Sequence, residues 1–343
     1  LPVSWAVKPT LYRQFVGGET LEDCRKTVRM LQEYNVKSVL DYSSEGGTEL
    51  EDVQKAYDET INSIDFARGN PGIAYTVFKP TAMIINRVLK KASDNYSSMG
   101  DIEKAEYVNF RERIFALCQR ANNSNVRILV DAEDFAYQEL IDRIVEEAMR
   151  RYNKERAIVF HTLQMYRKDR LDYLKFVHED SEKYKYIPGI KLVRGAYMED
   201  ERARAYELSY IDPIHPDKES TDISYNDGLR YIIENIDDFE LFSGTHNYDS
   251  NQLLADLIDE KGLKRDDSRI FFAQLYGMSD NISFSLAREG FNVCKYVPYA
   301  PVNKVLPYLL RRAEENSSIA GQTSRELHLI KTELERRRVQ KTN

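Results

Sequence analysis

Residues 189–197 of this chain read GIKLVRGAY. The first five letters include isoleucine, leucine and valine, which predict a short strand over residues 189–193. An arginine, a glycine, an alanine and a tyrosine follow directly. A strand that runs into a loop of this kind is the repeating unit of α/β barrels, in which the loops after the strands carry the functional side chains.

Seven further runs have the same character, and helical patterns separate them. The eight predicted strands cover residues 38–41, 74–78, 126–130, 157–161, 189–193, 240–243, 270–274 and 292–296. Helical patterns include residues 20–34, 50–67, 102–121, 136–152 and 252–261. This alternation predicts an α/β fold, namely a (β/α)8 barrel of the TIM type with additional N- and C-terminal helices. A doubly wound sheet is the alternative, although no GxGxxG motif follows the first strand.

The chain shows no linker or low-complexity tract, so residues 1–343 are expected to form a single domain. Residues 1–34 are expected to form an N-terminal helical segment. Residues 209–224 contain two prolines and a charge cluster, which indicate a long loop. Residues 321–343 are expected to form a polar C-terminal helix, whose basic end is a candidate for peripheral contact with a membrane surface.

Composition excludes several classes of function. A net charge of −7 argues against a nucleic-acid partner. The three cysteines, Cys24, Cys118 and Cys294, are far apart and belong to no CxxC or Cys/His cluster, so neither a metal site nor a disulfide scaffold is expected. The chain has no run of 18 apolar residues. A reducing, cytoplasmic location is expected, with the matrix side of the mitochondrial inner membrane as the eukaryotic equivalent.

Polar and aromatic side chains follow all eight predicted strands, where a barrel would gather them at one end. In strand order they are Asp41 and Glu45, Lys79, Asp131 and Glu133, Gln164 and Tyr166, residues 194–197, residues 245–247, residues 274–277, and Tyr299. Loops are polar in any fold, so several of these positions need no functional explanation. Convergence at all eight predicts a binding site.

Residues 308–317 read YLLRRAEENS. Helical spacing places Tyr308, Arg311 and Glu315 on one face, with Arg312 at its edge. Two adjacent guanidinium groups can bind a small carboxylate. The alternative is a solvated helix with surface Arg/Glu pairs.

Six segments resemble, in the same order, those of the proline dehydrogenase family, in particular its stand-alone members. They are residues 77–79, 130–133, 191–197, 244–247, 274–278 and 308–316. The resemblance implies a distorted (β/α)8 barrel that binds FAD and oxidises L-proline to Δ1-pyrroline-5-carboxylate, the first step of proline catabolism to glutamate. It also implies hydride transfer from the substrate C5 to the flavin N5, and a membrane quinone as the electron acceptor.

The resemblance assigns two sets of residues. The expected FAD contacts are Gln164, Lys191, Val193, Arg194, Gly195, Ala196, Lys218, Thr245, His246, Asn247 and Gln274. The expected substrate residues are Lys79, Arg311 and Arg312 around the carboxylate, Tyr197, Leu275, Tyr299 and Tyr308 around the ring, Asp131 beside Lys79, Glu315 beside the arginines, and Glu45 paired with Arg311. Structural roles remain the alternative for His246, Asp131 and Glu45.

Tyr299 bears on the choice of substrate. The related hydroxyproline enzymes resemble this pattern but have a smaller residue there, so the tyrosine favours proline over 4-hydroxyproline. Hydroxyproline dehydrogenase therefore stays as one alternative. A barrel lyase that forms a Schiff base through Lys79 or Lys191 is a second. A non-catalytic barrel that binds an amino acid is a third.

Overall fold

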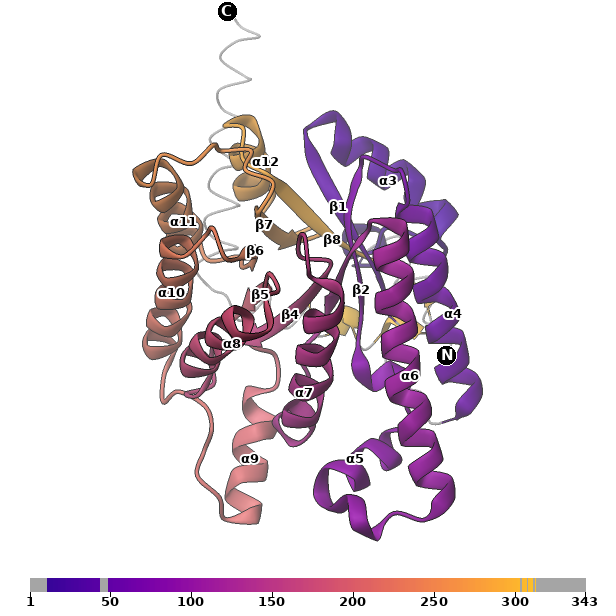
Figure 1. The fold of residues 1–343 in the computed structure, drawn as a ribbon. Coiled ribbons are helices and arrows are strands. Elements are labelled where there is room, and N and C mark those ends of the chain that lie inside the picture. The colour runs from indigo at the N-terminus through magenta and orange to yellow at the C-terminus, as the bar shows by residue number, and fades with distance from the viewer. Residues whose placement is uncertain (1–10, 44–48, 303, 307, 311, 313–343) are drawn as a thin grey trace, which may run out of the picture.

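The computed structural model describes residues 11–43, 49–302, 304–306, 308–310 and 312. Eight parallel strands form a closed barrel in chain order, and the last strand pairs with the first (Figure 1). The strands are β1 Val36–Tyr42, β2 Ile73–Phe78, β3 Arg127–Val130, β4 Val159–Gln164, β5 Gly189–Val193, β6 Glu240–Gly244, β7 Ile270–Leu275 and β8 Val293–Tyr299. The predicted (β/α)8 barrel is therefore confirmed.

Helices follow the strands and cover the barrel. Among the described residues they are α2 Arg13–Phe15, α3 Leu21–Glu33, α4 Leu50–Ala67, η2 Pro80–Met83, α5 Asn86–Asn95, η3 Tyr96–Ser98, α6 Asp101–Ser124, α7 Phe135–Tyr152, α8 Arg170–Tyr184, α9 Met198–Leu208, α10 Lys218–Glu234, α11 Tyr248–Glu260 and α12 Asp280–Arg288. Within this part of the chain, no helix has the length and apolarity needed to cross a membrane. The expected C-terminal helix at 321–343 lies outside the described residues.

Some predicted boundaries were wrong. The fourth strand was expected at 157–161 and is Val159–Gln164, and the eighth was expected at 292–296 and is Val293–Tyr299. The expected loop at 209–224 is shorter, because α10 begins at Lys218 after Asp217, whose side chain caps it. Strand ends depend on hydrogen bonds to the neighbouring strand, which hydropathy does not report.

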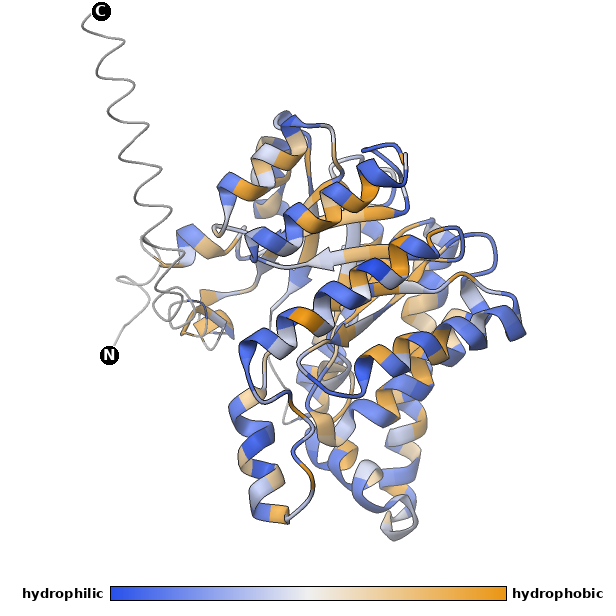
Figure 2. Ribbon diagram, turned by 90° about the vertical axis from the view of Figure 1, so that its left-hand side faces the viewer, coloured by the Kyte–Doolittle hydropathy of each residue, from blue (hydrophilic) through white to orange (hydrophobic). Residues whose placement is uncertain are grey.

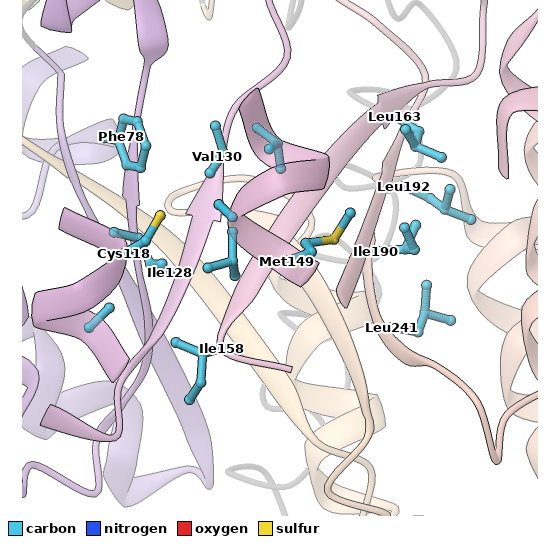
Figure 3. Close-up of a cluster of buried hydrophobic side chains, with 14 of the residues drawn as sticks. Phe78, Cys118, Ile128, Val130, Met149, Ile158, Leu163, Ile190, Leu192 and Leu241 are labelled. Carbon is cyan, nitrogen blue, oxygen red and sulfur yellow. The ribbon is translucent and has the colours of Figure 1, made fainter. Parts of the chain in front are cut away.

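The outer face of the barrel is apolar and packs against the helices. Ile128 and Val130 of β3, and Ile190 and Leu192 of β5, are fully buried in the main core cluster. Figure 3 shows these side chains beside Met149 of α7. The covering helices carry both hydrophilic and hydrophobic residues (Figure 2), as expected for helices with one face on the core and one in water.

The inner face forms layers along the barrel axis. Arg127 of β3 donates to Glu240 of β6 at 2.6 Å at the N-terminal end of the strands. A second apolar cluster fills the middle and includes Leu129, Phe160 and Phe242. Because side chains alternate between the two faces of a strand, the next inward positions towards the C-terminal ends include Asp131 and Lys191. A charged layer thus lies above an apolar floor.

Candidate functional site

Asp131 lies at the centre of the charged layer. Its Oδ1 accepts a hydrogen bond from the Lys191 ammonium group at 2.6 Å, and its Oδ2 accepts one from the Tyr296 hydroxyl at 2.9 Å. Nζ of Lys79 lies 3.7 Å from the same Oδ2 and 3.5 Å from Oδ2 of Asp41. These five residues come from β1, β5, β8 and the exits of β2 and β3, so only the closed barrel brings them together.

The carboxylates and the ammonium groups of this layer keep each other ionised. Burial alone would raise the pKa of Asp131, but Lys191 and Lys79 outweigh it, so the pKa is lowered. Burial alone would lower the pKa of Lys79, but Asp41 and Asp131 outweigh it, so the pKa is raised. Lys79 is therefore an ammonium ion rather than a nucleophilic amine.

Tyr296 forms one wall of this layer. Its ring lies 4.8 Å from the Lys191 ammonium group, a cation–π contact. Burial and the nearby Asp131 raise its pKa, with smaller contributions from Asp41 and Tyr308. Tyr296 was not among the predicted site residues.

A second carboxylate, Glu133, lies beside the first. It is 4% exposed, and its Oε1 accepts hydrogen bonds from both the backbone amide and the hydroxyl of Thr81. Its Oε2 accepts one from the Tyr197 hydroxyl at 3.0 Å. Gln164 donates to the backbone carbonyl of Glu133 and accepts from the amide of Ala196. The loops after β3, β4 and β5 are thereby locked together.

Gly195 has a conformation that side chains rarely adopt. Its φ is +139°, and an added Cβ would lie 2.4 Å from the Tyr166 ring. The Tyr166 hydroxyl donates to the buried Glu201 of α9 at 2.7 Å, which fixes the ring under the glycine. Tyr197 is the N-cap residue of α9, and Figure 1 shows α9 and α5 projecting at the same end of the barrel.

Arg194 uses its guanidinium group to hold the loop after β5 to two helices. Its Nε donates to Asp222 of α10 at 2.6 Å, and its terminal nitrogens donate to Thr245 and Ser250. Lys218, at the start of α10, lies 2.5 Å from the other oxygen of Asp222. The two predicted cations therefore share one carboxylate. Val193, the last residue of β5, is half-buried and accepts from the amide of Met165 through its carbonyl.

His246 is held as a neutral imidazole. Burial, Lys295 and Arg312 lower its pKa to about 3. Its Nδ1 lies 3.0 Å from the Ser279 hydroxyl. The next residue, Asn247, caps α11 by accepting from the amide of Ser250. A structural role is thus visible for both predicted contacts.

Leu275, Tyr308 and Arg312 lie near the end of the barrel at which the strands end, called the mouth below. Leu275 ends β7 and packs with the apolar cluster that includes Tyr308. The Arg312 guanidinium lies 5.2 Å from the centre of the Tyr308 ring. Three predicted residues, Glu45, Arg311 and Glu315, lie outside the described residues.

Two predicted site residues face away from the interior. Tyr299 is fully buried on the outer side of β8, where its hydroxyl lies 3.3 Å from the backbone carbonyl of Glu59 on α4. The expectation that Tyr299 points into the barrel is corrected, because Tyr296 is the tyrosine of this pair whose side chain faces the interior. Gln274 also points outward, since its amide group bonds to Asn251 of α11 and Ser283 of α12.

Comparison with known proteins shows the family of this chain. A family model described as proline dehydrogenase matches residues 24–325. The chain belongs to the proline dehydrogenase family.

Two relatives show how far the similarity extends. Proline dehydrogenase 2, mitochondrial, of Arabidopsis thaliana is 34% identical over 96% of this chain and 78% of its own length. The carbapenem antibiotics biosynthesis protein CarD of Pectobacterium carotovorum subsp. carotovorum is also 34% identical, over 95% of this chain and 84% of its own.

The barrel is also similar to a solved structure. The proline utilization A protein of Bdellovibrio bacteriovorus, inactivated by N-propargylglycine, superposes with a TM-score of 0.79 at 18% identity. The match covers 90% of this chain and 33% of that one, and because the identity is only 18% it concerns the fold alone. In this member of the family the charged layer lies at the C-terminal ends of the strands, the end at which barrel enzymes place their sites.

Proposed function

We propose that this chain oxidises L-proline to Δ1-pyrroline-5-carboxylate with FAD as its cofactor. The observation that carries the proposal is the charged layer of Asp41, Lys79, Asp131 and Lys191, with Tyr296 as one wall, in a member of the proline dehydrogenase family. Proline is a zwitterion with one carboxylate, one ring ammonium and a small apolar ring. The site offers cations, carboxylates and an aromatic wall to match.

The substrate carboxylate would bind the cations at the mouth. Lys79 keeps its positive charge, and Arg312 is fixed against the Tyr308 ring. Arg311 is proposed as a third cation, with Glu315 and Glu45 beside it. Truncating one arginine of such a charge cluster costs about 2–5 kcal/mol of binding.

The substrate ring would lie against Tyr296, Tyr197 and Leu275. Tyr296 is fixed by its hydrogen bond to Asp131, so its ring presents a rigid wall. A phenol at this position leaves little room for a ring hydroxyl, which favours proline over 4-hydroxyproline. The specificity role expected of Tyr299 therefore passes to Tyr296.

The residues of the interior fit a flavin. Thr162 of β4 is 3% exposed, and its hydroxyl has no partner among the described residues, although it pairs in register with Lys191. Its strand neighbour Gln164 and the exposed turn at Gly195 and Ala196 supply further polar groups beside it. When bound, FAD supplies the acceptor for the hydride that leaves the substrate C5.

Each protein group then has a defined task. Lys191, paired with Asp131, would supply positive charge to a bound flavin. Arg194 and Lys218 are proposed to bind the phosphates, with Thr245, His246 and Asn247 shaping the same end of the site. Gln274 contributes through Thr245, because its side-chain amide donates to the Thr245 backbone carbonyl at 3.1 Å.

The family resemblance supports a membrane quinone as the final electron acceptor. Such an acceptor requires contact between the enzyme and a membrane surface, on the inner mitochondrial membrane in a eukaryote or the cytoplasmic membrane in a bacterium. The lyase alternative is disfavoured, because Lys79 and Lys191 are both paired with carboxylates.

The test is an absorption spectrum of the purified protein before and after L-proline is added without oxygen. A flavin band that bleaches with L-proline is the expected result. A band that bleaches only with 4-hydroxyproline would transfer the assignment to that substrate. A colourless protein that cannot be reconstituted with FAD, and that borohydride links to a carbonyl substrate, would overturn the proposal in favour of the lyase.

A further inference from the structure

We infer that Glu133 is the terminal acceptor of the proton that leaves the substrate's ring nitrogen, and that the Tyr197 hydroxyl carries the proton to it. The inference rests on the proposed function and deepens it. Proline in water carries an ammonium group, which has no lone pair to form the C=N bond of the product. A proton must therefore leave the nitrogen before or during the loss of hydride.

The geometry provides a path for this proton. Tyr197 is half-buried at the start of α9, at the mouth of the barrel, and its hydroxyl donates to Oε2 of Glu133 at 3.0 Å. Glu133 is only 4% exposed, so the Tyr197 hydroxyl is the group that connects its carboxylate to the mouth of the barrel. Its other oxygen is saturated by the two donors of Thr81, so Oε2 is the oxygen left to receive a proton.

The other carboxylates of the site are less suited to the task. Asp131 is held by Lys191 and Lys79, and its pKa is lowered, which makes it a weaker base. Asp41 is hydrogen-bonded to Ser43 and lies beside Lys79. Glu133 is the carboxylate of this group whose pKa is raised, which increases its basicity.

The charges around Glu133 explain this difference. Burial raises its pKa, the Thr81 donors and Lys79 from the β2 exit oppose the shift, and Asp131 from the β3 exit reinforces it. Tyr197 faces it from α9, and Tyr137 of α7 lies close enough for its own pKa to be raised in part by Glu133. Lys79 and Asp131 act on the Glu133 pKa in opposite directions, and burial is the largest single effect on it.

The step balances in protons and electrons. The N–H bond of the substrate breaks and leaves its electron pair on nitrogen. A new O–H bond forms at the Tyr197 oxygen while the original hydroxyl proton moves to Oε2 of Glu133. The result is a neutral amine, an intact phenol and a neutral carboxylic acid.

The experiment compares pH profiles of kcat/KM for proline in the wild type, Glu133→Gln and Tyr197→Phe. The wild type should show a plateau on the alkaline side of the Glu133 pKa. Both variants should lose about 100-fold or more at pH 7. Their activity should then rise about tenfold per pH unit, because only substrate that is already deprotonated reacts.

A substrate analogue separates chemistry from structure. Thiazolidine-4-carboxylate has a less basic ring nitrogen, so a larger fraction arrives without its proton, and it should restore most of the lost rate in both variants. The control is Glu146→Gln, which alters a second buried glutamate that accepts from a tyrosine, Tyr173 at 2.7 Å, between α7 and α8. This control should keep the wild-type profile.

Two outcomes would overturn the inference. One is a variant profile with the wild-type plateau, even at reduced rate. The other is a loss of rate that neither high pH nor the analogue restores while the flavin spectrum stays intact. A wild-type protein that does not oxidise proline at all would instead refute the proposed function.

Discussion

Replacing Asp131 by alanine should lower the free energy of unfolding more than the loss of an exposed ion pair does. The carboxylate is 16% exposed and the Lys191 side chain 8% exposed, with 2.6 Å between them. Lys79 retains Asp41 at 3.5 Å, so Lys191 is the group left without its carboxylate. Removing one partner of a buried pair costs about 3–5 kcal/mol. Because some water reaches this site, we expect a loss of about 3 kcal/mol in the free energy of unfolding.

Urea unfolding at neutral pH measures this loss, and the chain offers a matched control. Asp65 and Arg120 form an exposed bidentate pair at 2.7–2.8 Å, with 41% and 47% exposure. Asp65→Ala should cost less than about 1 kcal/mol. Adding Lys191→Met to Asp131→Ala should recover part of the stability, because it removes the unpaired charge.

The same variant should alter the acid side of the stability curve. The pKa of Asp131 is lowered on folding, so its contribution is present above the unfolded value of about 3.9 and is lost as pH falls towards the folded value. The alanine variant lacks this contribution, and its stability should therefore fall less steeply below pH 4. If Asp131→Ala costs no more than Asp65→Ala, the description of this layer as a coupled buried network is refuted.

Two further predictions concern the shape of the site. Gly195→Ala should lower the free energy of unfolding by about 1–3 kcal/mol and release bound flavin on gel filtration, because the added Cβ meets the Tyr166 ring. The control is Gly262→Ala, at φ +68° with no atom within 4 Å, which should retain flavin. Tyr296→Ser should raise the ratio of kcat/KM for 4-hydroxyproline over proline by about tenfold, whereas Tyr299→Phe should leave the ratio unchanged. A shift in the Tyr299 variant would contradict the outward placement of Tyr299, and an unchanged ratio in the Tyr296 variant would contradict the specificity role of Tyr296.

The barrel was predictable because its signal is local and repeated eight times. Each strand needs an apolar outer face against the helices, and each exit needs polar residues, so the pattern survives without knowledge of contacts. Lys79 and Asp131 were expected at the site for the same reason, since they follow clear strands, whereas Lys191 was assigned through the family resemblance. The resemblance placed Asp131 beside Lys79, and the two side chains lie 3.7 Å apart. The pairing of Asp131 with Lys191 was not predicted, because the two residues are 60 positions apart and barrel closure brings them together.

Outer-face polar residues were the weak point of the prediction. Gln274 resembles a site residue because it lies near the end of a strand. In the structure its side-chain amide donates a hydrogen bond to Asn251 and accepts one from Ser283, between the barrel and its helices. A buried amide needs partners, and here α11 and α12 supply them, which the sequence of β7 does not reveal. The arginine at 194 is similar, because its partners belong to α10, α11 and the loop after β6.

The wrong prediction for the direction of the Tyr299 side chain follows from the wrong prediction for the end of β8. Side chains alternate along a strand, so two residues three positions apart face opposite sides. If β8 ended at 296, Tyr299 would be a loop residue that could turn towards the ligand. The ladder to β1 instead continues to the Tyr42–Tyr299 pair, which ties the two tyrosines of β8 to opposite faces. Tyr296 shares the inner cluster with Cys294, and Tyr299 shares the outer one with Val297. Once the strand extends to 299, only one of the two phenols can face the barrel interior, and the hydrogen bond to Asp131 identifies it as Tyr296.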